Sequence, residues 1–286
     1  MKQIFKIISS KLPLWGLGGL ILLSSCTCVD LEDPLKGKMT LVTDWSKRTS
    51  GIEQPASYMV IINNQTLNYT QATNILPELE AGNYPIYIYN SPDKISIAGT
   101  TATVATTGDL VDPLPGWLFT ATTEARYADF KEETITVQMR QQVRQLTITL
   151  KPTGGTIDKI SNITASLSGV AGAWDFKENK PTGNSVSVPL HFTKKEDGIW
   201  QIVVRLLGIT GSQQRLTGTV SFEGGLPADI AIDSDLSAVI TLFNTDKITP
   251  LLLQGEMKET PTEFGFTSVI TSWESGNGSG ETGNAE

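Results

Sequence analysis

Hydrophobic residues recur at every second position along most of this chain, and no other feature constrains its fold as strongly. In one stretch, Leu146, Ile148 and Leu150 alternate with Thr147 and Thr149. Because successive side chains of a strand point to opposite faces, this period predicts half-buried strands. The same period predicts strands at 58–62, 84–88, 135–139, 163–169, 186–192, 200–206, 220–222, 239–243 and 263–273. Short strands joined by turns rich in Gly, Pro, Asn and Asp predict an all-β fold of antiparallel β-sandwiches.

The apolar positions change phase once, and the change indicates a crossing in the fold. Apolar residues occupy odd positions from Ile135 to Val143 and even positions from Leu146 to Leu150. A slip of one residue turns the buried face of a strand to the solvent, so this change predicts a bulge or a crossing between domains.

The length of the chain supports two domains. The 261 residues that follow residue 25 exceed the usual size of a single domain and suggest two domains, and one large β domain is the alternative. With the boundary near residue 142, we predict β-sandwich domains at residues 37–142 and 143–274. The last segment, residues 275–286, contains alanine as its sole apolar residue, and we expect it to be disordered.

The first 25 residues have the three parts of a secretory signal peptide. Three lysines in the first eleven residues give a basic start, residues 12–23 are mostly apolar, and Ser24 and Ser25 are small. The apolar run is shorter than the roughly 20 residues that a transmembrane helix needs. We therefore predict that residues 1–25 are a signal peptide.

The two cysteines of the chain, Cys26 and Cys28, follow directly. Leu23 to Cys26 resembles a bacterial lipobox, in which the cysteine thiolate receives a diacylglyceryl group and becomes the new N-terminus. We predict that Cys26 is the lipidation site and that residues 26–36 are a lipidated linker. The alternative is a metal or disulfide element formed with Cys28, but two ligands are too few for a structural zinc site.

Charge restricts the partners of the mature chain. Loss of the three signal-peptide lysines from 22 basic residues leaves 19 against 30 acidic ones, a net charge of −11. This balance argues against nucleic acid, whose phosphates require basic surfaces, and against electrostatic attachment to anionic lipid. We therefore expect acyl chains to provide attachment to the outer membrane. Asp30, Glu32 and Asp33 resemble an acidic signal for export to the cell surface, although short acidic stretches are also common.

The sequence contains no motif that indicates catalysis. It has no Gly-x-Ser-x-Gly elbow, phosphate loop or His-Glu-x-x-His. The single histidine, His191, is predicted to lie on the solvent face of a strand with Ser187. Asp233 and Asp235 are expected in a solvated turn rather than in a calcium site. We predict no enzyme activity, no metal and no cofactor.

Aromatic residues leave one other function open. Tyr87 and Tyr89 lie opposite the apolar face of their predicted strand, and Trp117 lies in a proline-rich loop. A surface glycan-binding lipoprotein would stack sugars on such side chains. Aromatic residues are equally ordinary in sheets that are buried on both faces.

The order of several short motifs resembles the minor subunits of the fimbrillin superfamily, the anchor and accessory components of type V pili. These are the lipobox, Thr43-Asp44-Trp45, the crossing after Met139, the segment Ser166 to Gly172, and Gly265-Phe266 with Trp273 near the end. The resemblance implies two tandem transthyretin-like β-sandwich domains and a role in pilus assembly with pilin subunits as partners. It also implies polymerisation by strand exchange, in which a segment of one subunit completes the sheet of another.

The resemblance bears on Arg48 as well. In stalk-forming relatives a protease cuts after an arginine and removes the first strand, and Arg48 is the nearest match here. An anchor has to keep its lipidated N-terminus, so we expect Arg48 to remain uncleaved. The leading hypothesis is a pilus base anchor, with a pilus tip subunit or a glycan-binding lipoprotein as alternatives.

Overall fold

The computed structural model describes residues 36–154, 157–262 and 265–277. The chain divides into two compact units, Met1–Pro34 and Leu35–Glu286, and every described residue lies in the second. The predicted signal peptide and the predicted lipidation site, Cys26, therefore lie outside the described residues. The described part contains strands and two 3₁₀ turns but no α-helix, so the all-β prediction is confirmed. It also contains no helix that is long and apolar enough to span a bilayer.

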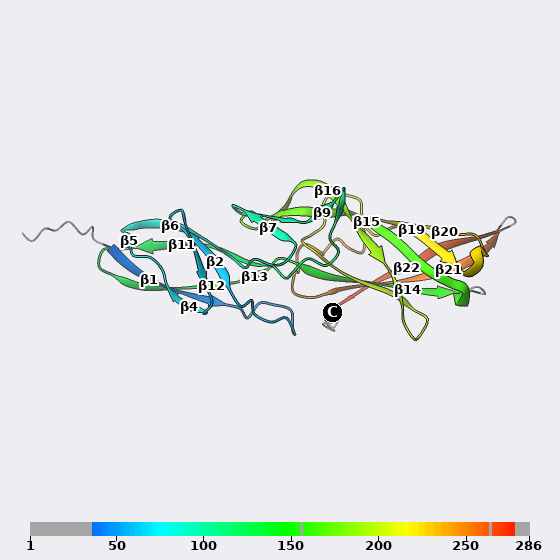
Figure 1. Cartoon of the computed structure of the whole chain (residues 1–286), viewed down its shortest axis with the longest axis horizontal. Helices are drawn as coiled ribbons and strands as arrows, with labels where there is room; N and C mark the ends of the chain where they lie inside the picture. Colours follow the sequence, from blue (N-terminus) through cyan, green and yellow to red (C-terminus); the bar gives the residue numbers. More distant parts are fainter. Residues whose placement is uncertain (1–35, 155–156, 263–264, 278–286) are drawn as a thin grey trace, which may run out of the picture. The chain divides into compact units, whose positions relative to one another are not determined.

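Two sheets enclose a first hydrophobic core (Figure 1). One has the strand order β12-β1-β4, with β5 also paired to β1, and the other has the order β13-β11-β6-β2-β3. Their strands are β1 (Lys36–Asp44), β2 (Tyr58–Ile62), β3 (Gln65–Tyr69), β4 (Thr73–Ile75), β5 (Leu79–Glu80), β6 (Gly82–Tyr89), β11 (Phe119–Tyr127), β12 (Glu132–Gln138) and β13 (Arg140–Gln141).

Two further sheets enclose a second core. One has the order β20-β19-β15-β16-β10-β9, with β8 paired to β15 and β7 to β8, and the other has the order β17-β18-β14-β21-β22. Their strands and turns are β7 (Ile95–Ala98), β8 (Thr101–Val104), β9 (Thr106–Thr107), β10 (Leu110–Val111), β14 (Arg144–Thr153), η1 (Ile157–Lys159), β15 (Ile160–Asp175), β16 (Lys180–His191), β17 (Thr193–Lys194), β18 (Trp200–Leu206), β19 (Arg215–Phe222), η2 (Glu223–Gly225), β20 (Ile230–Asp235), β21 (Leu251–Thr262) and β22 (Gly265–Asn277).

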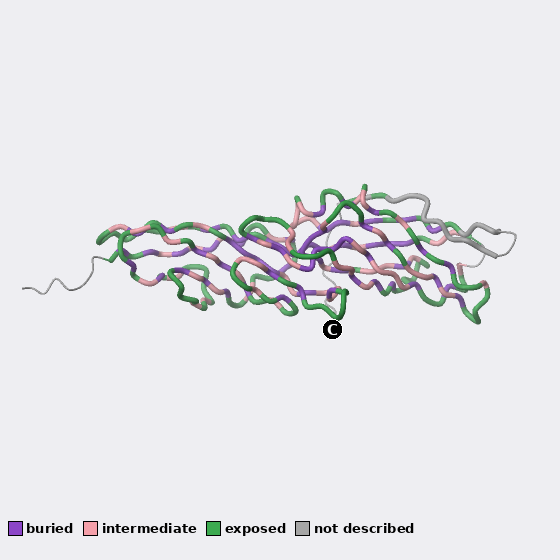
Figure 2. The backbone as a smooth tube through the Cα atoms, turned by 90° about the horizontal axis from the view of Figure 1, so that it is seen from above, coloured by how far each residue is buried: buried purple, intermediate pink, exposed green. Residues whose placement is uncertain are grey.

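Alternating burial accounts for the strands that the period predicted. In β14, Leu146, Ile148 and Leu150 are fully buried, and in β2 the burial alternates along the strand. Asn63 and Asn64 adopt φ angles of 47° and 59° between β2 and β3, which gives the turn the twist that a two-residue hairpin needs. Figure 2 shows buried residues along the inside of the sheets and exposed residues at the turns.

The two cores interleave along the sequence. Residues 95–111 follow β6 of the first core, yet Ala102 and Val104 belong to the second. There β8 pairs with β15 and β10 pairs with β16. The chain then returns to the first core at β11. The division into 37–142 and 143–274 stays a prediction about folding units.

The phase change in the sequence lies where the chain passes from one core to the other. Met139 belongs to the first core and Val143 to the second. Between and beside them, Gln141, Gln142 and Arg144 are buried although they are polar or charged. Several consecutive residues are buried here because the segment contacts protein on more than one side.

Three predicted details were wrong. Residues 239–243 are a series of turns instead of a strand, because Leu236, Ile240 and Phe243 form one buried face at helical spacing. The strand predicted to end at Gly169 continues to Asp175 through a register shift at this glycine, whose φ is 74°. The last strand, β22, runs to Asn277, three residues into the segment expected to be disordered.

Strand direction also differs in part from the prediction. Most pairs are antiparallel, but β1 runs parallel to β12 and β14 runs parallel to β21. A period of two assigns the faces of a strand and carries no information on the direction of its neighbours.

Candidate functional site

The first strand, β1, is built into the interior of its sheet. It pairs with β12 along one edge and with β4 and β5 along the other. Met39 and Leu41 are almost completely buried in the first core. Removing β1 would therefore expose this core and leave β12, β4 and β5 without a partner.

The loop after β1 holds Arg48 in place. Its Nε donates a hydrogen bond to the carbonyl of Ile52 at 2.9 Å, and its Nη1 donates one to the carbonyl of Trp45 at 2.5 Å. The Trp45 ring is buried and lies edge-on to Tyr58 and Phe119, with ring centroids 5.7 Å apart in both pairs. The Arg48 guanidinium thus links the two ends of the loop, at Trp45 and Ile52.

Thr49, on the other side of the Arg48 peptide bond, is buried and ties this loop to the crossing segment. Its amide donates to Gln141 Oε1 at 2.9 Å, and its hydroxyl donates to the carbonyl of Ile248. Gln141 Nε2 in turn donates to Thr49 Oγ1 at 3.0 Å and to the carbonyl of Lys247 at 2.7 Å. The bond that a protease would cut is therefore fixed on both sides.

The loop at residues 242–249 receives several of these contacts. The buried Arg144 donates to the carbonyls of Thr249, Leu242 and Phe243, and its guanidinium lies 5.2 Å from the centre of the Phe243 ring. Burial lowers the pKa of Arg144, against the opposing effect of the nearby Asp246 carboxylate. The Arg144 side chain thus fixes the backbone of the loop at residues 242–249 through three carbonyl groups.

Of the charged residues around this loop, Lys247 has the pKa that is shifted furthest from its ordinary value. Its amine donates to the carbonyl of Leu207 and lies 4.0 Å from the centre of the Trp174 ring. Burial lowers the pKa of Lys247 to about 7, and the Arg144 charge acts in the same direction. The stem of this lysine covers aromatic surface while its amine contacts a carbonyl.

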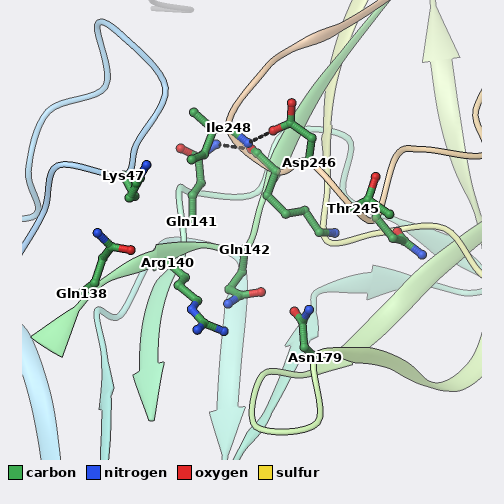
Figure 3. Close-up of a pocket in the computed structure, with 11 residues that line it drawn as sticks. Lys47, Gln138, Arg140, Gln141, Gln142, Asn179, Thr245, Asp246 and Ile248 are labelled. Carbon is green, nitrogen blue, oxygen red and sulfur yellow. Dashed lines mark hydrogen bonds between the residues drawn. The ribbon is translucent and has the colours of Figure 1, made fainter. Parts of the chain in front are cut away.

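A cavity of about 290 Å³ opens beside this loop (Figure 3). Lys47 and Arg140 supply positive charge to its wall, and Gln142 and Asn179 supply amide groups. Asp246 accepts hydrogen bonds from the amides of Ile248 and Thr249 at 2.9 and 3.0 Å, which helps to lower the pKa of its carboxyl group against the effect of burial. No serine, cysteine or histidine lines the cavity among the described residues. Asp246 and Ile248 line the cavity as well, so its wall carries both charges and some apolar surface.

His191, Asp233 and Asp235 all lie on strands of one sheet of the second core. His191 is exposed at the end of β16, as predicted. Asp233 and Asp235 lie in β20 rather than in the predicted turn, because the strand extends further than its apolar residues indicated. Asp233 forms an ion pair with Arg215 at 2.5 Å. No group of three potential metal ligands occurs in the described part of the chain.

The aromatic residues that left glycan binding open do not form an exposed platform. Tyr87, Tyr89 and Trp117 are partly buried and pack against the second core. The Arg205 guanidinium lies over the Trp117 ring, 5.2 Å from its centre. These side chains serve packing, which is the ordinary role of aromatic residues in a sheet covered on both faces.

Sequence reasoning missed Gln141, Arg144 and Lys247. In the sequence, the buried polar residues around Gln141 are visible only as a change in the phase of the apolar positions. The helical spacing of Leu236, Ile240 and Phe243 is the signal that would have predicted turns before the loop at 242–249. Of the residues named in the sequence, Val143 accepts a hydrogen bond from Gln141, and Arg48 precedes Thr49, which is bonded to Gln141.

The fold and this fixed N-terminal region define a two-core β-sandwich protein that retains its first strand. Comparison with known proteins then assigns the family. The chain belongs to the family of fimbrillin-A associated anchor proteins Mfa1 and Mfa2, whose sequence profile matches residues 59–225. It is thus an accessory fimbrial subunit, and its family implies association with the cell surface. No curated protein matches the sequence.

Solved structures share the fold at low sequence identity. The fimbrial anchor protein Mfa2 from Porphyromonas gingivalis superposes with a TM-score of 0.57 and 12% identity, over 85% of this chain and 98% of that one. A candidate adhesin from Bacteroides ovatus gives 0.59 and 11% identity, over 85% and 96%. A candidate polysaccharide-binding protein from Bacteroides thetaiotaomicron gives 0.55 and 7% identity, over 80% and 93%. The family model and the first of these structures are named as fimbrial anchor proteins, and the second as an adhesin.

Proposed function

We propose that this chain is the lipid-anchored base subunit of a pilus, attached to the outer membrane through acyl chains on Cys26. It binds a pilin by β-strand complementation. The observation that carries the proposal is the position of β1, which pairs on both edges and connects residue 36 directly to the interior of the first core. A lipid on Cys26 would remain joined to the folded protein as long as β1 stays in its sheet.

The Arg48 loop supports the same assignment. A stalk subunit activated by proteolysis needs an accessible arginine and a first strand that can leave. Here Arg48 is bonded to two carbonyls, and Thr49 is buried and bonded to Gln141. Proteases bind the cleaved segment in an extended form, so these contacts would have to break before cleavage.

The C-terminal strand supports a terminal position in the polymer. β22 pairs with β21 from Asn277 to Gly265, and the only irregularity is one register shift. β22 also lies against β20 of the facing sheet. A C-terminal strand that pairs along its length with β21 of its own sandwich is not extended towards a neighbouring subunit, which favours the base or the tip over the stalk.

Unpaired strand edges offer the means of binding a pilin. β12 and β4 end one sheet of the first core, β13 and β3 end the other, and no described strand pairs with the outer edges of these strands. An added strand would satisfy the free N–H and C=O groups of such an edge, and its alternate side chains would supply specificity. This mode of binding requires no catalytic residue.

Membrane fractionation tests the anchor. We expect the wild-type protein in the outer-membrane fraction and the Cys26→Ala variant in the soluble fraction, with Cys28→Ser as the matched control that keeps membrane attachment. Full membrane retention of Cys26→Ala would contradict lipid attachment at this residue.

Purification of the acylated protein with its neighbours tests the partner. We expect a pilin to co-purify as a complex that resists mild detergent and dissociates on heating. N-terminal analysis of the same sample should find no chain that begins at Thr49. A mature protein starting at Thr49, or retention on an oligosaccharide gel without any pilin, would contradict the assignment.

A further inference from the structure

The turn between β11 and β12, residues 128–131, presents one large apolar side chain to the solvent. Phe130 is 77% exposed, the largest exposed fraction among the described hydrophobic side chains. The turn is closed by a hydrogen bond from the amide of Lys131 to the carbonyl of Ala128 at 3.2 Å. We call residues 128–131 the β11–β12 tip.

The conformation of Phe130 makes its presence at this position unusual. Its φ is 55°, in the left-handed region that Gly and Asn occupy most readily and that bulky residues avoid. An exposed phenyl ring also gains nothing from burial within the fold. Asparagine or glycine would satisfy the turn better, so the fold itself does not account for a phenylalanine here.

The tip lies at the end of the molecule where β1 begins. The amide of Lys38 donates to the carbonyl of Lys131 at 2.8 Å. The Gly37 backbone lies so close to the tip that a Cβ atom there would be 2.5 Å from the Ala128 carbonyl oxygen. The start of β1 and the tip therefore form one rigid end, and the chain that leads to Cys26 leaves from it.

We propose that Phe130 inserts into the lipid surface to which the N-terminal acyl chains attach, so that the protein contacts the membrane at the tip as well as through its tether. This inference rests on the proposed lipid anchor at Cys26. Ten peptide steps separate Cys26 from Lys36, and an extended chain of that length spans at most about 35 Å. The linker therefore holds the start of β1, and the tip beside it, within reach of the bilayer and allows contact between the tip and the lipid surface.

The charges around the tip point to apolar insertion rather than electrostatic binding. Lys36 and Lys131 are exposed and have no ion-pair partner in the described part of the chain, whereas Asp129 is an exposed acid next to Phe130. Lys38 is engaged with Glu132 at 3.3 Å and with Glu78 at 3.8 Å. With little net charge at the tip, insertion of the ring should depend only weakly on salt and on lipid charge.

A fluorescent probe at the tip tests this inference. The acylated full-length protein, in a Cys28→Ser background with Phe130→Cys labelled by an environment-sensitive dye, is reconstituted into phosphatidylcholine vesicles. We expect a blue shift of emission, quenching by a spin-labelled lipid and protection from aqueous iodide, unchanged when half the lipid is phosphatidylglycerol. The matched control is Leu226→Cys, at a site in the second sandwich that is also 73% exposed, and its label should remain quenched by iodide.

Flotation of the same vesicles separates the two proposals. If the protein floats and the label at residue 130 stays accessible to iodide, the tip inference is wrong and the lipid anchor stands. If the label changes only when a pilin is added, the tip binds protein and the inference is again wrong. If the acylated protein fails to float, the anchor and the inference fall together.

A second variant, Phe130→Asn, removes the apolar side chain. We expect it to fold normally, with an unchanged circular dichroism spectrum. On vesicles, a protease should cut this variant after Lys131 faster than it cuts the wild type, because the tip is no longer held in the lipid surface.

Discussion

Gln141 joins three backbone segments through one carboxamide group. Its oxygen accepts from the amide of Thr49, and its nitrogen donates to the carbonyls of Val143 and Lys247 and to the Thr49 hydroxyl. The residue is 3% exposed, so water cannot replace these partners. A buried side chain that hydrogen-bonds several other polar groups stabilises the structure mainly because its removal would leave these groups buried without a hydrogen-bond partner.

Replacement of Gln141 should therefore be costly. We expect Gln141→Leu to lower the free energy of unfolding by at least about 2 kcal/mol, because the Thr49 amide and the Lys247 carbonyl lose their partners. Urea denaturation measures the effect. The control is Gln138→Ala at an exposed position, which should stay within about 0.5 kcal/mol of the wild type. Equal effects of the two variants would contradict the role given to Gln141.

The titration of Lys247 should make stability depend on pH. Its pKa is about 7 in the folded protein and about 10.4 when unfolded, so the unfolded chain binds the extra proton between these values. The contribution of Lys247 to stability is least favourable below pH 7 and improves up to about pH 10, with a slope of at most about 1.4 kcal/mol per pH unit.

Comparison with Lys247→Met isolates this effect. We expect the stability of the variant relative to the wild type to be greatest near pH 7 and to decline towards pH 10, as measured by urea denaturation at fixed ionic strength. Lys195→Met, at an exposed position, is the control and should show no such trend. A constant difference across this range would show that Lys247 keeps an ordinary pKa.

At the scale of single elements, β15 shows how a long strand serves two neighbours. It pairs with β19 over residues 160–167 and with β8 over residues 173–175, while β16 follows it along most of its length. The register with β16 shifts at Gly169, between Leu167 and Val170, and again between Ala171 and Ala173. A bulge of this kind bends the strand, so that its two halves pair with different partners.

Gly169 is needed there for space as well as for conformation. A Cβ atom at this position would be 2.4 Å from the carbonyl oxygen of Gln213, whereas at Gly183, with a similar φ of 76°, it would meet nothing within 4 Å. We expect Gly183→Ala to cost about 1 kcal/mol from its backbone angle alone and Gly169→Ala to cost clearly more. Thermal unfolding of the two variants measures the difference, and equal losses would mean that the Gln213 backbone moves away freely.

At the scale of the whole described unit, contacts between segments far apart in sequence join the two cores. Thr49 follows the first strand, Gln141 lies in the crossing segment, and Ile248 lies in the loop before β21. The loop that contains Arg48 is thus stabilised by residues of both cores. For a base anchor this arrangement would keep the membrane-attached strand β1 and the loop after it joined to the second core.

Limited proteolysis tests this connection. We expect an arginine-specific protease to leave the Arg48–Thr49 bond of the native protein intact while it cuts the same bond in the urea-unfolded chain. In the Gln141→Leu variant this bond should be cut faster than in the wild type, because Thr49 loses its amide partner. Mass spectrometry of the fragments gives the result, and rapid cutting of the native wild type would remove the structural argument for an uncleaved anchor.

The sequence by itself determined the fold class and most strands. Alternation in segments such as β14 and β18 is local, since each buried face repeats within a few residues, and the change of phase after Met139 marked the passage between cores. The exposure of His191 followed from the same alternation.

Only the tertiary structure decided the rest. The parallel pairing of β1 with β12, the addition of residues 95–111 to the second core and the position of Lys247 over Trp174 depend on segments far apart in the chain. The physical reason is that a period of two assigns the faces of a strand, whereas its neighbours and their direction are chosen by the packing of whole sheets.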